Sequence, residues 1–233
     1  MYDNYISCYL SELVGTFILC LGVASGTFYE PDGSQRTNYI LTLSVIFTSI
    51  IINARIGGGD FNPGVTLTKY LCYQNKQKFH ITNVIICYTI CQCIGALLSF
   101  LYYAYASNYT IIYKLKVSPH NTMFEGFVME LVSSFFTYFF IILIDQNKTM
   151  TNYPLKMFCC MAAVATGMSI GGSTSGAGLN PAVGFGASLA RLFLTGNLNE
   201  IEHLWIFILA PIAAAFFASK AFEAMKDIYY CKV

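Results

Sequence analysis

Long apolar stretches separated by short polar segments run along almost the whole chain. Six of them approach the length of about 20 apolar residues that a helix needs to cross a bilayer. They cover residues 5–27, 39–56, 81–105, 123–144, 154–170 and 203–222. Two shorter helices are expected between them, at about 62–72 and 180–194. Each would span about half a membrane at 1.5 Å per residue, which predicts re-entrant half-helices rather than full crossings.

Both short helices begin at an asparagine-proline pair inside apolar sequence. Asn is a favourable N-cap, and Pro suits the first helical position because its missing N–H has no partner there. The residues that begin the two helices are Asn62, Pro63 and Gly64 in the first half and Asn180, Pro181 and Ala182 in the second. Non-helical backbone at membrane depth is tolerated where it is buried in protein or lines a wet cavity. The two segments therefore predict a cavity beside them.

The second half of the chain repeats the first at a constant offset. Asn180 follows Asn62 by 118 residues, and each asparagine comes 50 residues after a glutamate in an apolar stretch, Glu130 or Glu12. Interrupted hydrophobic segments at matching places in two halves indicate opposed half-helices that meet at a transport site.

The composition agrees with a membrane protein. Hydrophobic residues make up 56% of the chain and charged residues 11%, against about 25% charged in ordinary soluble domains. A net charge of +1 does not provide the basic face that nucleic-acid binding needs. We expect an all-α membrane protein with six transmembrane helices and two re-entrant half-helices. Residues 1–233 would form a single transmembrane channel domain, an inverted repeat of about 1–110 and about 119–233.

Cysteine and histidine give no sign of metal or enzyme chemistry. Most of the nine cysteines fall in apolar runs, where Cys behaves as a small hydrophobe. The histidines, His80, His120 and His203, are widely separated in the sequence. No nucleophile, histidine and acid recur together on the expected spans. We therefore expect neither an enzyme nor a cofactor or metal site.

The chain resembles the aquaporin and aquaglyceroporin (major intrinsic protein) family over nearly its whole length. The two asparagine-proline segments carry the likeness together with three further patterns. These are Glu12-x-x-Gly15-Thr16-Phe17, Gln92-Cys93-Ile94-Gly95-Ala96, and Trp205-Ile206-Phe207 with Pro211. The resemblance implies a passive channel for water, with small uncharged solutes such as glycerol, urea or hydrogen peroxide. It also implies a homotetramer with one pore per subunit.

The expected pore centre combines helix dipoles with amide donors. The N-terminus of a helix carries about half a positive charge, and the side chains of Asn62 and Asn180 can donate N–H groups beside it. Cations would meet a barrier there, while water would find donors. Backbone carbonyls of 55–61 and 173–179 would supply acceptors. A carboxylate in an apolar span is costly. For Glu12 and Glu130 the resemblance implies that each holds the adjacent loop through its backbone amides, and a proton relay is the alternative.

The expected selectivity filter departs from the family pattern. The residue after the second Asn-Pro-Ala is normally an arginine, and here it is Val183. Counting without gaps from the asparagines, the other filter positions fall on Thr42, Met168 and Ala177. Such a filter has one hydroxyl, no charge and none of the five donors of a guanidinium. Arg191, eight residues further on, is either a substitute or a contact at the helix end.

Two departures near the first asparagine carry further expectations. Gly64 stands where the family usually has Ala, which costs about 1 kcal/mol of helix propensity and predicts slight widening of the pore. Asp60 stands where many relatives have His. It is either a hydrogen-bonded structural carboxylate or a group that responds to pH or a divalent cation.

Orientation follows from the distribution of Lys and Arg. With both termini cytoplasmic, nine of these residues face the cytoplasm and four face the other side, which the positive-inside rule favours. The four are Arg36, Lys114, Lys116 and Arg191. The membrane would be the plasma membrane or an internal one. Two alternatives to an open water pore remain: a closed-pore structural or junctional protein, motivated by Met168 and Val183, and a gated ion pathway, motivated by the missing arginine.

Overall fold

The computed structural model describes residues 3–29, 35–53, 59–72 and 78–230. In these ranges the chain forms eight α-helices, one 3-10 helix and two short strands. In chain order they are α1 (Asp3–Ser25), β1 (Thr27–Tyr29), β2 (Gln35–Thr37), α2 (Tyr39–Asn53), α3 (Pro63–Cys72), α4 (Lys78–Ala106), α5 (Met123–Gln146), α6 (Tyr153–Gly171), α7 (Pro181–Thr195), η1 (Leu198–Ile201) and α8 (Leu204–Tyr230). The expectation of an all-α membrane protein is confirmed by this helical content, apart from the small hairpin.

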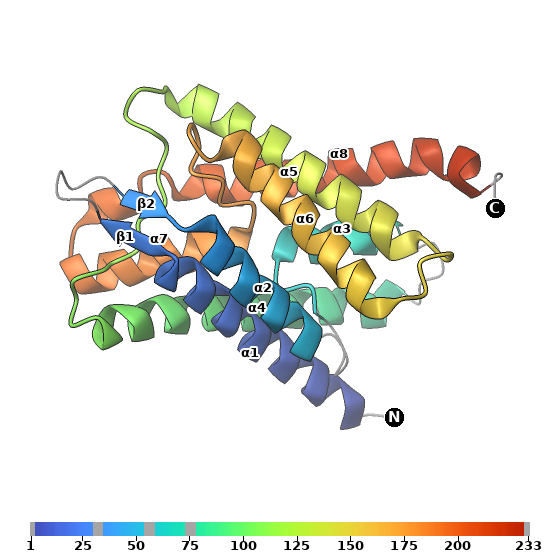
Figure 1. Cartoon of the computed structure of the whole chain (residues 1–233), viewed down its shortest axis with the longest axis horizontal. Helices are drawn as coiled ribbons and strands as arrows, with labels where there is room; N and C mark the ends of the chain where they lie inside the picture. Colours follow the sequence, from blue (N-terminus) through green and yellow to red (C-terminus); the bar gives the residue numbers. More distant parts are fainter. Residues whose placement is uncertain (1–2, 30–34, 54–58, 73–77, 231–233) are drawn as a thin grey trace.

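The two half-helices start near the middle of the molecule and run to opposite ends (Figure 1). Helix α3 has 10 residues and α7 has 15. Both begin with proline directly after the capping asparagine, as the local sequence predicts. The long helices run beside them, and the two chain termini lie at the same end of the molecule (Figure 1).

The two halves of the chain pack in the same way. Helix α1 packs against α2 and α4, and α5 packs against α6 and α8. Each half-helix crosses into the other half, because α3 packs against α8 and α7 packs against α4. The first and second halves are therefore interlocked.

Glycine permits the closest helix contacts in this bundle. A Cβ on Gly95 of α4 would lie 2.3 Å from the backbone carbonyl oxygen of Leu13 in α1. A Cβ on Gly186 of α7 would lie 2.7 Å from the backbone of Ala96 in α4. Helix pairs in lipid depend on such close backbone approach, because burial from water does not drive them together.

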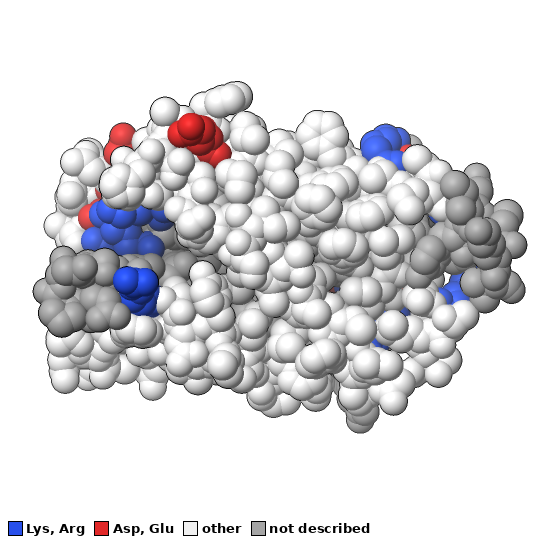
Figure 2. Space-filling model, turned by 45° about the horizontal axis from the view of Figure 1, so that its top comes forward, with Lys and Arg blue, Asp and Glu red and all other residues white. Residues whose placement is uncertain are grey.

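Five of the described helices are long and apolar enough to cross a membrane. The apolar helix α2 is shorter, and the expected second span at 39–56 runs beyond it into residues outside the described ranges. Charged side chains gather at the two ends of the face in Figure 2, and the band between them is almost uncharged. This band has the chemistry of a surface that faces lipid.

The hairpin between α1 and α2 was not expected from the sequence. Strands β1 and β2 pair antiparallel, with Thr27 opposite Thr37. The first span consequently ends at Ser25 rather than at residue 27. Strands of three residues are too short for an alternating pattern to be recognised. The hairpin matters for the site because it brings Arg36 to one end of the cavity.

Candidate functional site

The site is built around the asparagines that cap the two half-helices. Asn62 Oδ1 accepts a hydrogen bond from the N–H of Gly64 at 2.8 Å, and Asn180 Oδ1 accepts one from the N–H of Ala182 at 2.9 Å. These bonds satisfy amide groups that a helix start otherwise leaves unpaired. They also turn the amide nitrogen of each side chain away from its own helix.

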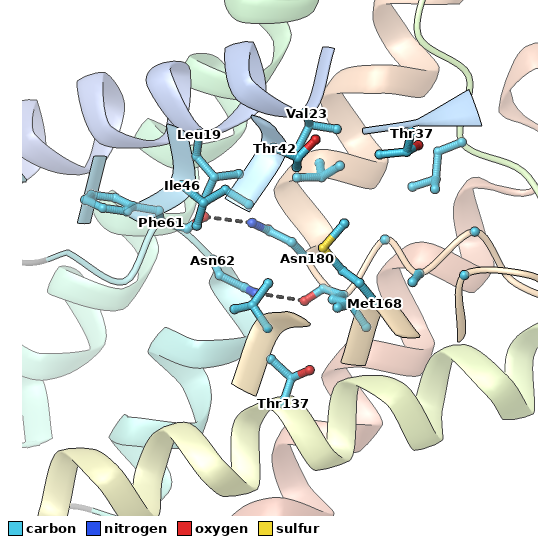
Figure 3. Close-up of a pocket in the computed structure, with 18 of the residues that line it drawn as sticks. Leu19, Val23, Thr37, Thr42, Ile46, Phe61, Asn62, Thr137, Met168 and Asn180 are labelled. Carbon is cyan, nitrogen blue, oxygen red and sulfur yellow. Dashed lines mark hydrogen bonds between the residues drawn. The ribbon is translucent and has the colours of Figure 1, made fainter. Parts of the chain in front are cut away.

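Each asparagine also reaches the loop that precedes the other. Asn62 Nδ2 donates to the carbonyl oxygen of Leu179 and Asn180 Nδ2 donates to the carbonyl oxygen of Phe61, both at 2.8 Å (Figure 3). A side-chain amide has two N–H groups, so one remains on each asparagine. Both residues line the cavity, and this second N–H is the donor that they can offer to a permeating molecule.

The loops that lead into the half-helices are held in a strained conformation. Phe61 and Leu179, the residues before the asparagines, have φ of 50° and 53°, and Ala177 has φ of 50°. For residues other than glycine the left-handed region costs roughly 1–2 kcal/mol each. Such a conformation persists where the surrounding structure compensates for it.

Glu12 supports the first loop. Its side chain is completely buried in α1. It accepts hydrogen bonds from the N–H of Asp60 at 2.9 Å, the N–H of Phe61 at 2.8 Å and the side-chain amide of Gln92 at 2.7 Å. Charge-assisted bonds of this kind are stronger than neutral ones. The geometry fits the loop-holding role of this carboxylate.

Glu130 supports the second loop in the same way. It is completely buried in α5 and accepts hydrogen bonds from the N–H of Leu179 at 2.5 Å, the N–H of Gly178 at 3.2 Å and the hydroxyl of Ser175 at 2.7 Å. Among the described residues, the lining of the cavity does not include Glu12 or Glu130. Their position behind the wall does not favour the proton relay.

A cavity of about 920 Å³ lies beside the junction of the half-helices, and its lining includes residues of β2 and of the C-terminal ends of α3 and α5. Arg36, Lys114 and Lys116 lie at one end, and Lys69 and Asp145 lie at the other. Residues 59–61 and 176–179 of the two loops also line the cavity, where their backbone can offer polar groups. The opposite wall is largely apolar and includes Leu19, Val23, Ile46, Ile50, Ile141 and Val164. Uncharged solutes could exchange water for protein hydrogen bonds along such a path without tight binding.

All four expected filter residues line this cavity. Val183 and Met168 present apolar surface, and Ala177 contributes a methyl group beside loop backbone. Thr42 is completely buried, and its hydroxyl lies against Gly26, where an added Cβ would come within 2.1 Å of the oxygen. Among the described residues this hydroxyl has no hydrogen-bond partner. The filter is thus more apolar than the sequence suggested.

Arg191 belongs to a cluster at the end of α7. Its Nε lies 2.6 Å from Glu200 Oε2, and its Nη1 donates to the carbonyl oxygen of Ile112 at 2.8 Å. It is absent from the described lining of the cavity. Of the two interpretations of this arginine, the geometry favours the contact at the helix end.

Asp60 combines a structural role with a place in the cavity wall. Its carboxylate accepts a hydrogen bond from the hydroxyl of Thr66 at 2.9 Å and pairs with the ammonium group of Lys69 at 2.6 Å. In the part of the chain that the structure describes, no group of three or more His, Cys, Asp or Glu residues could hold a metal ion. The hydrogen-bonded interpretation of Asp60 fits these contacts.

The expected widening at Gly64 is wrong. A Cβ on this residue would lie 2.1 Å from the phenolic oxygen of Tyr138, so the space of the missing methyl is already filled. Sequence reasoning overlooked Tyr138 as well as the support that Gln92 and Ser175 give to the glutamates. The signal for Tyr138 was an aromatic residue at the position that corresponds to the small Cys20 in the first half.

Comparisons with known proteins agree with this geometry. The family model for the major intrinsic protein matches residues 3–222. Aquaporin-8 of Botryotinia fuckeliana is 24% identical, over 97% of this chain and 71% of that protein. Nodulin-26 of Glycine max is 28% identical (88% and 73%), and the aquaglyceroporin of Plasmodium berghei is 25% identical (90% and 86%).

A solved structure shares the fold. The X-ray structure of the aquaglyceroporin from Plasmodium falciparum matches with a TM-score of 0.75, over 94% of this chain and 96% of that one. The two sequences are 19% identical, so this likeness concerns the arrangement of the helices.

Proposed function

Because this chain belongs to the major intrinsic protein family, we propose that its cavity is a pore through which water and small uncharged solutes cross a membrane passively. Members of this family are membrane channels and not enzymes. The observation that carries the proposal is the reciprocal pair of bonds at the centre, made by Asn62 and Asn180, which both line the cavity and each have a second side-chain N–H. Two positive helix ends that meet there oppose cations.

We further propose that glycerol, urea and hydrogen peroxide are candidates to pass beside water. The support is chemical: Met168, Ala177 and Val183, the expected filter residues that line the cavity, are apolar and uncharged, while loop backbone can offer hydrogen bonds. Such a wall suits the carbon face of a small polyol better than a guanidinium would. The Plasmodium berghei relative, which is named an aquaglyceroporin, is 25% identical to the chain.

Osmotic swelling and shrinking of proteoliposomes tests the function. Vesicles with the purified protein are expected to respond faster than empty vesicles to a step in sucrose, and to re-swell in gradients of glycerol or urea. Rates equal to those of empty vesicles, for water and every neutral solute, would refute the proposal.

The two alternatives differ in their support. A closed-pore structural protein draws its support from Met168 and Val183, which both line the cavity. The water permeability of the proteoliposomes distinguishes it from an open channel. A gated ion pathway retains one favourable observation, the uncharged filter. Ionic current through the protein in a planar bilayer distinguishes this alternative from a channel for neutral solutes.

We also propose that the termini face the cytoplasm and that the protein assembles as a homotetramer. The excess of Lys and Arg in the segments on that side supports the orientation, and both termini lie at one end of the molecule (Figure 1). The tetramer follows from the family resemblance. Either the plasma membrane or an internal membrane is compatible with the chain.

A further inference from the structure

Tyr138 touches the pore centre from behind the cavity wall. It lies in α5, is completely buried, and is not among the described residues that line the cavity. Its phenolic oxygen is 2.8 Å from the carbonyl oxygen of Leu179 and 3.3 Å from Asn62 Oδ1. A phenol has one proton to donate. The shorter distance makes Leu179 the principal acceptor and Asn62 a weaker second one.

The carbonyl of Leu179 therefore accepts two hydrogen bonds, one from Tyr138 and one from Asn62 Nδ2 at 2.8 Å. This carbonyl belongs to a strained residue, with φ of 53°, and its oxygen sets the direction of the Asn62 amide. Fixing the oxygen fixes the amide, and with it the direction of the remaining Asn62 N–H.

Gly64 makes room for this tyrosine. A Cβ on Gly64 would lie 2.1 Å from the phenolic oxygen and 2.4 Å from the ring carbon that carries it. Real Cβ atoms essentially never show contacts below 3.0 Å, so a methyl group on Gly64 would require the completely buried Tyr138 side chain to shift. The two residues fit as a pair, and alanine is compatible with this position only when the side chain at 138 is smaller.

The other half of the chain shows the complementary solution. The offset of 118 residues relates Tyr138 to Cys20 and Gly64 to Ala182. Cys20 and Ala182 are both completely buried in one hydrophobic cluster. One half thus combines a small side chain, Cys20, with an alanine, Ala182. The other half combines a large side chain, Tyr138, with a glycine, Gly64.

The size exchange makes the pore centre asymmetric. The carbonyl of Phe61 accepts a bond from Asn180 Nδ2, but the corresponding α1 residue, Cys20, has no phenol to add a second one. A carbonyl with two donors is a weaker acceptor for a passing molecule than a carbonyl with one.

We propose that Tyr138 is a positioning residue of the pore, whose hydroxyl fixes the Leu179 carbonyl and through it the Asn62 amide, and that Gly64 is its obligatory partner in size. The transport consequence rests on the proposed channel function. The size pairing does not, because it concerns packing alone.

Thermal unfolding of purified variants tests the pairing. Gly64→Ala is expected to lower the melting temperature when Tyr138 is present. The double variant Gly64→Ala/Tyr138→Cys copies the residues of the other half of the chain. Its melting temperature should equal that of Tyr138→Cys alone, because the added methyl group then has space. An equal loss of melting temperature on adding the methyl in both backgrounds would overturn the pairing. If Gly64→Ala alone does not fold, a double variant that also fails to fold, while Tyr138→Cys folds, would overturn it.

Proteoliposome transport tests the positioning role through Tyr138→Phe, which keeps the ring and removes the hydroxyl. We expect the water permeability per channel to fall roughly two- to tenfold, the size of effect that the loss of one hydrogen bond produces, and the ratio of glycerol to water permeability to change with it. Tyr103→Phe is the matched control, because Tyr103 is half-buried against the Cys20 cluster and is not a described lining residue.

The outcomes separate the two proposals. Wild-type permeability in Tyr138→Phe, with an unchanged solute ratio, overturns the positioning role while leaving the channel intact. A wild-type protein that transports neither water nor solutes overturns the proposed function and the positioning role together. In that case the melting temperatures still decide whether Gly64 and Tyr138 are a size pair.

Discussion

Val183 is the single side chain that most separates this pore from the family pattern. It is 3% exposed and belongs to the same buried cluster as Phe207. It lies in the first turn of α7, where this helix borders the cavity. An arginine at this position would place a planar cation with five donors at the constriction. The valine supplies neither the charge nor these donors, so hydrogen bonds at this position can come only from the backbone.

Val183→Arg is expected to narrow selectivity toward water. The guanidinium would occupy the space that a polyol uses and would bind its hydroxyl groups, so the ratio of glycerol to water permeability should fall about tenfold, which corresponds to about 1.4 kcal/mol in the barrier. Stopped-flow light scattering of proteoliposomes measures both permeabilities.

Val183→Leu is the control for size without charge. A smaller change in the ratio is expected from the leucine variant. An unchanged ratio in Val183→Arg would mean that residue 183 does not lie at the constriction.

At the scale of elements, two buried carboxylates hold the two strained loops in place through hydrogen bonds to their backbone amides. Glu130 in α5 and Glu12 in α1 each bind consecutive backbone amides just before a half-helix. The amides of Leu179 and Phe61 would otherwise be buried donors without partners. The half-helix ends therefore owe their positions to helices that are far from them in the sequence.

Glu130→Gln is expected to destabilise the second loop. One carboxylate oxygen becomes an NH₂ group that faces donors, the backbone N–H of Leu179 or the hydroxyl of Ser175, so the free energy of unfolding should fall by about 1–3 kcal/mol. Thermal unfolding in detergent measures the loss.

Glu223→Gln provides the comparison, because Glu223 forms an ion pair with the exposed Lys220. Exposed pairs contribute at most about 1 kcal/mol. Equal melting temperatures for the two glutamine variants would contradict the loop-holding role of Glu130.

At the scale of the whole molecule, the two ends of the cavity differ in charge. Arg36, Lys114 and Lys116 line the end beside the β1–β2 hairpin, and Asp60, Lys69 and Asp145 line the other. Basic side chains raise the local potential and repel cations before they reach the half-helix ends. Both the basic entrance and the half-helix ends at the centre would then exclude cations. Together they would replace the charge that an arginine in the filter provides in the family.

Reversing the charge of two basic residues at this entrance tests whether they help to exclude cations. The double variant Arg36→Glu/Lys116→Glu is expected to conduct more K⁺ than the wild type in planar bilayers, while water permeability is unchanged because neither side chain lies at the constriction. Lys148→Glu, an exposed residue outside the described lining of the cavity, is the control. Equal K⁺ currents in all three proteins would show that the entrance charge does not exclude cations.

Much of the architecture could be predicted because its causes are local. The lengths of the apolar runs and the Asn-Pro caps at Asn62 and Asn180 act over a few residues, so they indicated the helices and both half-helix starts. The constant offset between the two asparagines, with Glu12 and Glu130 at matching distances, indicated the repeat. The short hairpin escaped prediction since three-residue strands carry no period.

What surrounds each pore residue depends on contacts between distant segments, and no local pattern encodes them. Thr42 counts as a polar filter residue in the sequence, yet its hydroxyl faces Gly26 instead of offering a donor to the cavity. The sequence suggests open space at Gly64, yet the side chain of Tyr138 fills it. Tyr138 is 76 residues from Asn62 in the sequence. Local chemistry determined where the half-helices start, and packing between the two halves determined which groups the pore presents.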